Sequence, residues 1–517
     1  MSNPRSASRI WPMLLIALGP VASVSLLLAL TCRGTLLDCV AIWHDETMYW
    51  NEIAVFYGGG FDGGYTAANE TIARAPWVHF AAHGPFYPAF MGLIARVTAL
   101  TPTSIALVNV ALCVAASCLW LAIVRPNTKQ AWIAAFLVNT FWPLVAYLPS
   151  SMQEGLHYAL AFAIAGVSTA LIRAPKDFRW QLASLLVVVA AAQIRVTWGW
   201  ILLPLAWVVL QPRTWLSWIG LLLGSGALIG GLYGEAIWLY APFPNFMGDV
   251  LETLKHDPLG AVTMILKHAS KGTGHYLTPT RDNWLEVGLR YQVMLITGAA
   301  CYHVWRGRRK ADEPPAIADE PARQSLLAFG FVALNMFSIL AFVIAFYDIF
   351  DWRDYRVVAP HLFVSLLVLV GVGAKEWLGG YAVLAVLLGV AVVPQFSEFH
   401  LERVAYDQAQ IAEFAQEIGQ LIPFDPQADP WDNTVVLHID HINTPLVASF
   451  PPGIGIAPVL DWKVQAMPPR SRYVLLKPKD LPHVTIPPNL KKIAETRLGD
   501  LYMRSDAEES DSTKPAR

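Results

Sequence analysis

Long stretches of apolar residues recur along most of the chain and predict its fold. An α-helix needs roughly 20 apolar residues to cross the hydrocarbon core of a bilayer. Repeated stretches of about that length predict a polytopic α-helical membrane protein with about 11–13 transmembrane helices. The predicted membrane segments are 10–30, 84–124 (in two pieces), 130–148, 151–173, 180–195, 196–210, 214–240, 288–305, 325–347, 357–374 and 377–394.

Two of these segments leave the number of crossings open. Clusters of Lys and Arg prefer the cytoplasmic side, and they alternate correctly only if 84–124 makes one net crossing. The first piece of that segment is then a re-entrant or interfacial helix, or the side assigned to one loop is wrong. Arg195 interrupts the apolar stretch between 180 and 210. A charged side chain is costly inside a membrane, so Arg195 is expected to face a cavity or the outer interface, where it contacts a lipid phosphate or only reaches for water.

The charge pattern also predicts an orientation and a division into domains. Basic residues such as Arg5, Arg9 and those within 306–310 mark the cytoplasmic side. The long segments between them then face outward. We predict a transmembrane domain over 1–394 with outer loops 31–83 and 241–287, an extracytoplasmic domain over 395–504, and a polar, disordered tail over 505–517.

The chain changes character after Pro394, where apolar runs shorten and Pro and Asp become more frequent. Residues 400–421 have the periodicity of an amphipathic helix. Short alternating or β-branched runs predict strands over 434–439, 472–476 and 501–504. This pattern is typical of a small α/β domain.

Composition supports a membrane protein and narrows its class. Of the 517 residues, 55% are hydrophobic and only 15% are charged, and the formal net charge of -2 gives no sign of nucleic-acid binding. Cys113, Cys118 and Cys301 lie in or beside apolar segments, as packing residues do. Cys32 and Cys39 flank a short stretch outside the first segment, where a disulfide and two free thiols are both open.

An acidic pair, Asp45 and Glu46, lies in the first outer loop about fifteen residues beyond the first membrane segment, an unusual place for two carboxylates in so apolar a chain. Carboxylates at a membrane–water boundary are candidates for acid–base work on a substrate located there. Asp45 and Tyr49 share one helical face with Glu52 or Ile53. The alternative is structural, because acidic residues at a helix N-terminus also complement the helix dipole.

Two motifs together resemble a known family. Asp45-Glu46-x-x-Tyr49 is followed by His83-Gly84-Pro85-Phe86-Tyr87-Pro88, which opens an apolar helix. In order and position they resemble the GT-C superfamily of integral membrane glycosyltransferases, especially its protein-mannosyltransferase and aminoarabinose-transferase branch. Many members have Pro where this chain has Gly84. Two further segments resemble family motifs: Glu154 near Pro149, loosely, and the run of Arg353, Tyr355 and Pro360.

The resemblance implies a reaction. Members of this family transfer a sugar from a polyprenyl-phosphate carrier to an acceptor at the outer face of the membrane, with inversion in a single displacement. A carboxylate deprotonates the acceptor and cations hold the leaving phosphate. The implied catalytic residues are Asp45 as base and Glu46 as its support. The implied donor-phosphate residues are Arg353 and Arg356, then Lys271 and Arg281. The supporting residues are Tyr49, His83, Tyr87, Glu154 and Tyr355.

Each of these residues has a structural alternative. His83 before Gly-Pro is a common cap or interfacial residue. Arg353 and Arg356 can anchor the chain at the membrane surface, with Asp351 and Asp354 as partners. Glu154 and His157, one helical turn apart, can form a hydrogen-bonded pair. The outward Asp, Glu and His residues show no tight ligand spacing, so no metal is assigned, although a divalent cation stays possible.

The expected partners are therefore a polyprenyl-phosphate sugar donor, a lipid, glycan or protein acceptor, and the surrounding lipids of a bacterial inner membrane, with the active site facing the periplasm. Two other functions remain open: a transporter or flippase of lipid-linked sugars, and a non-catalytic assembly factor for polysaccharide. Transporters of this kind usually contain internal repeats and deeply buried charges. This chain shows no repeat, and Arg195 is its one candidate for a deep charge. The sequence does not identify the sugar or the acceptor.

Overall fold

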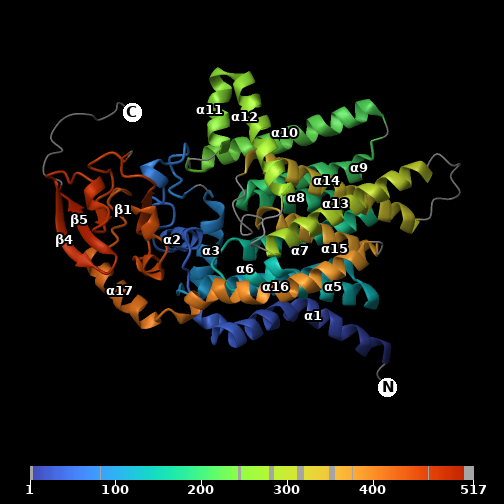
Figure 1. Ribbon diagram of the computed structural model, residues 1–517, viewed down its shortest axis with the longest axis horizontal. Coiled ribbons are helices and arrows are strands. Elements are labelled where there is room, and N and C mark those ends of the chain that lie inside the picture. Colours follow the sequence, from blue (N-terminus) through green and yellow to red (C-terminus); the bar gives the residue numbers. More distant parts are fainter. Residues whose placement is uncertain are drawn as a thin grey trace. The chain divides into compact units, whose positions relative to one another are not determined.

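The computed structural model divides the chain into two compact units (Figure 1). The helical unit comprises Met1–Cys39, Ala106–Glu235 and Pro244–Ala405. The mixed unit comprises Val40–Ile105, Ala236–Phe243 and Tyr406–Arg517. The structure describes residues 4–81, 83–212, 214–242, 246–278, 284–310, 320–347, 356–374, 377–463 and 465–505.

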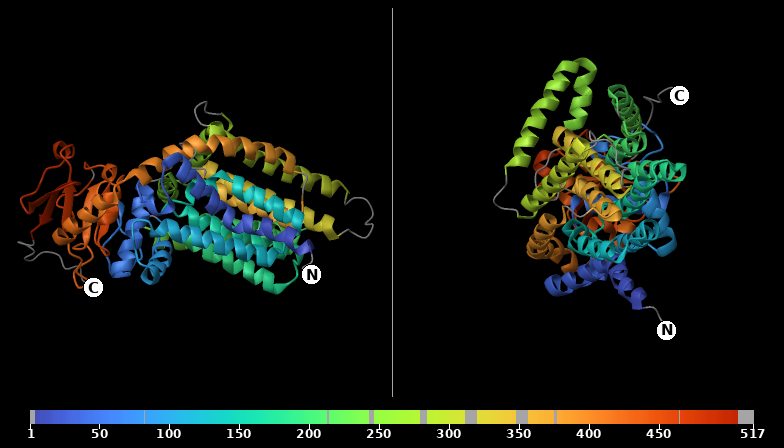
Figure 2. Two further views of the ribbon diagram at one scale, coloured as in Figure 1. Left: turned by 90° about the horizontal axis from the view of Figure 1, so that it is seen from below. Right: turned by 90° about the vertical axis from the view of Figure 1, so that its right-hand side faces the viewer.

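Long helices running side by side make up the helical unit (Figure 2). They are α1 (Pro4–Leu27, continued by the π-helical turn η1, Leu28–Cys32), α4 (Ser104–Val124), α5 (Thr128–Thr140), α6 (Trp142–Tyr147), α7 (Glu154–Arg173), α8 (Phe178–Ile194), the 3₁₀ helix η4 (Val196–Ile201), α9 (Leu202–Leu210), α10 (Trp215–Leu239), the hairpin of α11 (Phe246–His256) and α12 (Pro258–Leu277), α13 (Trp284–Lys310), α14 (Glu320–Phe346), α15 (Ala359–Val372) and α16 (Leu378–Ala405).

The expectation of a polytopic α-helical membrane protein is confirmed. Six helices among the described residues are long and apolar enough to cross a membrane, and three shorter helices are also apolar. Their number is below the expected 11–13 because several apolar segments are broken. The segment 130–148 divides at Phe141, since Pro143 in the first turn of α6 lacks the N–H that a continuous helix would need. The segment 84–124 forms two helices, of which α3 (Phe86–Thr98) has 13 residues. At 1.5 Å per residue α3 is about 20 Å long, too short to span a bilayer.

The predicted break at Arg195 is confirmed. α8 ends at Ile194, and Arg195 adopts an extended backbone (φ -149°, ψ 116°) before η4 begins. The expected domain boundary at 394/395 falls inside α16, which continues through Pro394 to Ala405. The amphipathic pattern over 400–421 accordingly belongs to two helices, the end of α16 and α17 (Gln408–Leu421). α17 begins where the Asp407 carboxylate accepts the N–H of Ala409.

The mixed unit contains the expected small α/β domain. Its five strands are β1 (Thr434–His438), β2 (Gly455–Val459), β3 (Tyr473–Leu476), β4 (Leu490–Thr496) and β5 (Gly499–Arg504), in the order β2-β1-β3-β5-β4. β1 is parallel to both β2 and β3, and β5 is antiparallel to β3 and β4. The strands expected over 434–439, 472–476 and 501–504 are β1, β3 and β5. Sequence inspection missed β2 and β4. β2 carries Pro458, which a strand tolerates at the edge of a sheet.

The first outer loop folds onto this sheet domain within the mixed unit. Its helix α2 (His44–Gly59) donates two side-chain hydrogen bonds to backbone carbonyls of the domain. Thr47 Oγ1 bonds Ile442 O at 3.0 Å, and Asn51 Nδ2 bonds Ile454 O at 3.0 Å. Met48 packs against the apolar core formed by α17 and one face of the sheet.

No disulfide joins Cys32 and Cys39 in the part of the chain that the structure describes.

Candidate functional site

The acidic pair lies in the first turn of α2, and its two members differ in their surroundings. The Glu46 side chain is fully buried, and its Oε2 accepts the backbone N–H groups of Ile42 (2.9 Å) and Trp43 (3.4 Å). These donors precede the helix, so Glu46 satisfies amide groups that the helix itself cannot. Asp45 is half-buried. Glu46 is therefore buried and hydrogen-bonded to the backbone before α2, whereas Asp45 is partly open to solvent.

The two sequence motifs meet at Tyr49. Tyr49 Oη lies 3.1 Å from His83 Nε2, and the two rings pack edge to face with centroids 4.7 Å apart. Tyr87 packs edge to face on the other part of the Tyr49 ring at 5.6 Å. Tyr49 and Tyr87 are both buried. Residues more than thirty positions apart in the sequence thus form one cluster.

Gly84 makes the turn between His83 and α3 possible. Its φ is +73°, a conformation that side chains other than glycine rarely adopt. A Cβ at this position would also lie 2.2 Å from the Tyr240 ring. Proline, with φ fixed near -65°, cannot occupy this turn. The departure from the family pattern therefore reflects a local backbone that only glycine fits.

Glu52 belongs to this cluster, although it was not among the sequence candidates for catalysis. It is fully buried, its Oε1 accepts the N–H of Ala81 at 2.9 Å, and its Oε2 has no hydrogen-bond partner among the described residues. Burial raises its pKa from 4.5 to about 8; the Ala81 N–H opposes this and the charge of Asp45 adds to it. The signal in the sequence was its position on the same helical face as Asp45 and Tyr49.

Glu52 thus holds a proton at neutral pH, two helical turns from Asp45. Two carboxyl groups in different surroundings, one of them kept protonated by burial, form the arrangement that enzymes use for acid–base work.

A second polar cluster lies within the helical unit. Glu154, the first residue of α7, is completely buried. Its Oε1 lies 2.6 Å from an Nη of Arg195 and 3.9 Å from Nε of Arg356. The side chains of Arg195 and Arg356 are 14% and 16% exposed. The Glu154 carboxylate therefore lies close to two guanidinium groups that are partly exposed to solvent. Together these three residues carry a net charge of about +1.

Further buried polar side chains continue from Glu154 along the helices. His157, one turn further along α7, accepts the indole N–H of Trp198 at 3.1 Å through Nδ1. Trp198 stacks on His361 with ring centroids 4.8 Å apart, and His361 Nδ1 lies 2.8 Å from Asn335 Oδ1. The expected hydrogen bond between His157 and Glu154 is replaced by this link to Trp198. The chain of contacts holds α7, η4, α14 and α15 in register around the arginine pair.

The remaining candidates are less informative. Lys271 is exposed on α12, and no described contact joins it to Glu154, Arg195 or Arg356. Arg281, Arg353 and Tyr355 lie outside the described residues. Arg195, which the sequence singled out as a costly charge, is paired with Glu154 in the structure.

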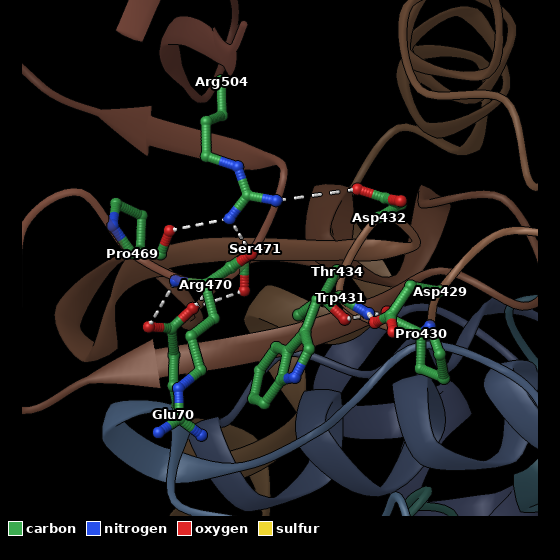
Figure 3. Close-up of polar contacts among 10 residues, drawn as sticks. All are labelled: Glu70, Asp429, Pro430, Trp431, Asp432, Thr434, Pro469, Arg470, Ser471 and Arg504. Carbon is green, nitrogen blue, oxygen red and sulfur yellow. Dashed lines mark hydrogen bonds and ion pairs between the residues drawn. The ribbon is translucent and has the colours of Figure 1, made fainter. Parts of the chain in front are cut away.

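Another carboxylate of the mixed unit, Glu70, is structural (Figure 3). Its oxygens accept the backbone N–H groups of Arg470 (3.0 Å) and Ser471 (2.7 Å), the Ser471 hydroxyl (2.7 Å) and the Gln465 side-chain amide (2.8 Å). A carboxylate with four donors is fully satisfied. Glu70 therefore fastens the first loop to the sheet domain.

Comparisons with known proteins place the chain near one set of solved structures. No family model and no curated protein sequence matches it significantly. It is similar to ArnT from Cupriavidus metallidurans bound to undecaprenyl phosphate, with 11% identity and a TM-score of 0.40 over 96% of this chain and 98% of that chain. The apo structure of ArnT matches over the same shares with 11% identity and a TM-score of 0.38. ArnT belongs to the aminoarabinose-transferase branch that the motifs resemble. Similarity of this strength does not by itself establish a common function.

Proposed function

We propose that this protein is a membrane glycosyltransferase that takes a sugar from a polyprenyl-phosphate donor and transfers it to an acceptor, with inversion, on the periplasmic face of a bacterial inner membrane. The observation that carries the proposal is the Tyr49–His83 contact at 3.1 Å. It joins the two motifs that resemble the family, one helical turn along α2 from Asp45, the residue that we propose as the base.

The α2 cluster supplies the proton chemistry in this proposal. As the acceptor oxygen or nitrogen attacks the anomeric carbon, Asp45 takes its proton, and the bond from that carbon to the phosphate oxygen breaks. A base placed in this way contributes about 10²–10⁴-fold to the rate. Glu46 fixes the first turn of α2 that carries Asp45. Tyr49 and His83 support the same turn from the side.

The arginine cluster supplies the phosphate site. The leaving group is a lipid phosphate, which gains negative charge as the sugar departs. Arg195 is hydrogen-bonded to Glu154 at 2.6 Å, and Arg356 lies 3.9 Å from the same carboxylate oxygen. Guanidinium groups bind phosphate oxygens in pairs, and they stabilise charge more strongly where water is scarce.

The test is the substitution Asp45→Asn in the full-length protein. Transfer of radiolabelled sugar is measured from a panel of undecaprenyl-phosphate-linked sugars, together with binding of undecaprenyl phosphate itself. We expect the transfer rate to fall about 10²–10⁴-fold while binding of undecaprenyl phosphate stays within twofold. Asp62→Asn is the matched control, because Asp62 is an exposed aspartate of the same loop. This control should leave both quantities unchanged.

Near-normal transfer by the Asp45→Asn variant would remove Asp45 as the base. A wild-type protein that moves lipid-linked sugars across vesicles without transferring them would instead favour the flippase alternative. Loss of polysaccharide assembly without either activity would favour the assembly factor.

A further inference from the structure

Three side chains of the kinds that bind metals come together at the carboxyl ends of β1 and β3. In the sequence they are distant from the residues of the two clusters described above. They are His438, His441 and Asp480, and one ligand atom from each lies within 4.8 Å of the other two. His438 is the last residue of β1, and His441 ends the 3₁₀ helix η6 (Ile439–His441). Asp480 follows β3 and precedes the 3₁₀ helix η8 (Leu481–His483).

The place of this cluster in the sheet is where α/β domains bind ligands. β1, β2 and β3 are parallel, so their carboxyl ends lie at the same edge. In the order β2-β1-β3 the chain leaves β1 on one side to form β2 and then returns to the other side to form β3. The gap between the carboxyl ends of β1 and β3 is therefore a topological switch point, the usual binding crevice of such sheets. His438, His441 and Asp480 follow these two strand ends.

His441 is a buried imidazole without a conventional partner. It is 1% exposed, and neither ring nitrogen makes a hydrogen bond of good geometry among the described residues. Neutral imidazole is the form in which a histidine binds metals.

The distances suit a small tetrahedral ion. His441 Nε2 lies 3.3 Å from Asp480 Oδ2. Two ligands of zinc at about 2.1 Å in tetrahedral geometry are about 3.4 Å apart, so this pair fits without movement. His438 is 19% exposed, and rotating its side chain inward by about 1 Å closes the remaining gap.

The surroundings also orient the ligands. His438 Nδ1 accepts the N–H of Asp440 at 3.3 Å and lies 3.5 Å from Asp440 Oδ2. A metal bound at Nε2 requires the tautomer with the proton on Nδ1, which then donates toward this carboxylate, a common support of metal-binding histidines. Asp480 Oδ2 accepts the N–H of Lys477 at 2.8 Å, which fixes the carboxylate. The positive charges of Lys477 and Lys479 disfavour binding of a cation, and the negative charges of Asp440 and Asp480 offset this repulsion.

We propose that His438, His441 and Asp480 bind one zinc-class divalent cation, with water as the fourth ligand, and that this ion ties η6 to the turn before η8. Two imidazoles favour zinc over magnesium and calcium, which prefer oxygen ligands. The site is independent of the sugar-transfer proposal, since it shares no residue with the α2 cluster or the arginine cluster.

The experiment uses the full-length protein, purified in detergent and stripped with EDTA. Zinc is added, and the ions retained per chain after gel filtration are counted by elemental analysis, with affinity from competition against a chelating dye. His438→Asn keeps an acceptor for the N–H of Asp440 at the place of Nδ1 and removes Nε2. Asp480→Asn removes the charge. His483→Asn, an exposed histidine of the same turn, is the control.

We expect the wild-type protein and His483→Asn to retain one zinc ion per chain and to melt at a higher temperature with zinc than with EDTA. His438→Asn and Asp480→Asn should bind zinc at least tenfold more weakly and lose the zinc-dependent shift in Tm. Both variants should keep the wild-type Tm in EDTA, which separates a lost ligand from a misfolded domain. Retention of no zinc by the wild type, or wild-type affinity in both ligand variants, would overturn the proposal. Equal affinity for magnesium would also overturn it.

Discussion

The two polar clusters of this protein bury a carboxylate in opposite ways. In the helical unit, Glu154 is fully buried and ionic, with guanidinium groups of Arg195 and Arg356 at 2.6 and 3.9 Å. In the mixed unit, Glu52 is equally buried but has one amide donor and a pKa raised to about 8. One cluster compensates its carboxylate with positive charge, and the other keeps it neutral with a proton.

This difference assigns the clusters different chemistry. A carboxylate flanked by two arginines leaves an excess of positive charge, which attracts an anion. A carboxylate that holds a proton at neutral pH, beside the half-buried Asp45, is suited to moving protons. A transfer from a lipid phosphate needs both tasks. The following substitutions test whether burial of Glu154 depends on its arginine partners and whether burial of Glu52 depends on its bound proton.

The largest expected effect is on the paired carboxylate. Glu154→Gln keeps the shape of the side chain and removes its charge, which leaves two guanidinium groups close together without compensation. Removing one partner of a buried ion pair costs about 3–5 kcal/mol of unfolding free energy. We expect a clear fall in Tm in detergent, measured by intrinsic fluorescence. Glu320→Gln is the control, because the Glu320–Arg323 pair is exposed on the first turn of α14; such pairs contribute about 0–1 kcal/mol. Equal Tm values for both variants would mean that Glu154 is not an essential counter-charge.

The protonated carboxylate predicts a dependence on pH. Because the pKa of Glu52 is raised in the folded protein from 4.5 to about 8, the folded state holds a proton that the unfolded chain releases in this range. The stability from this group is complete below pH 4.5 and is lost as the pH rises to 8. Between pH 5 and 8 the loss amounts to about 3–4 kcal/mol. Glu52→Gln, which is neutral throughout, should flatten this part of the curve, as followed by thermal unfolding at several pH values.

Glu413→Gln provides the matched comparison. Glu413 is exposed in the same unit and pairs with Arg497 at 2.7 Å. This variant should keep the wild-type slope between pH 5 and 8. An unchanged slope in Glu52→Gln would show that Glu52 is ionised in the folded protein, and the contrast between the two clusters would then disappear.

The broad fold was predictable because it rests on local patterns. Apolar stretches predicted the helices, and the interruption at Arg195 predicted the end of α8. Properties that depend on distant partners were not predictable. α16 continues past Pro394, and β2 pairs at the edge of the sheet despite Pro458, since neighbouring elements compensate for weak local preference.

The same distinction applies to the sites. Asp45, Tyr49, His83 and Tyr87 were found because they belong to motifs, and the structure joins three of them directly. Glu52 was overlooked because its unusual property is burial, which the sequence does not show. His438, His441 and Asp480 were overlooked because the pairing of β1 with β3 brings them together.

The smallest expected effect is on the affinity for undecaprenyl phosphate when Arg356 is replaced by lysine. Arg356→Lys keeps the positive charge but replaces a planar group of five donors with a single ammonium. If Arg356 binds phosphate by paired hydrogen bonds, affinity for undecaprenyl phosphate should fall about tenfold, equivalent to about 1.4 kcal/mol. If it only anchors the helix end electrostatically, affinity should not change. Binding is measured by displacement of a fluorescent lipid phosphate.

Arg323→Lys is the control for this substitution, since Arg323 pairs with Glu320 on an exposed helical turn.

The Asp45→Asn variant completes the comparison, because removing the proposed base should spare phosphate binding. Weaker phosphate binding in Arg356→Lys with normal binding in Asp45→Asn would separate anion recognition from proton transfer. The opposite result, in which Asp45→Asn loses binding and Arg356→Lys keeps it, would assign anion recognition to the mixed unit and contradict the division of tasks drawn from Glu154 and Glu52.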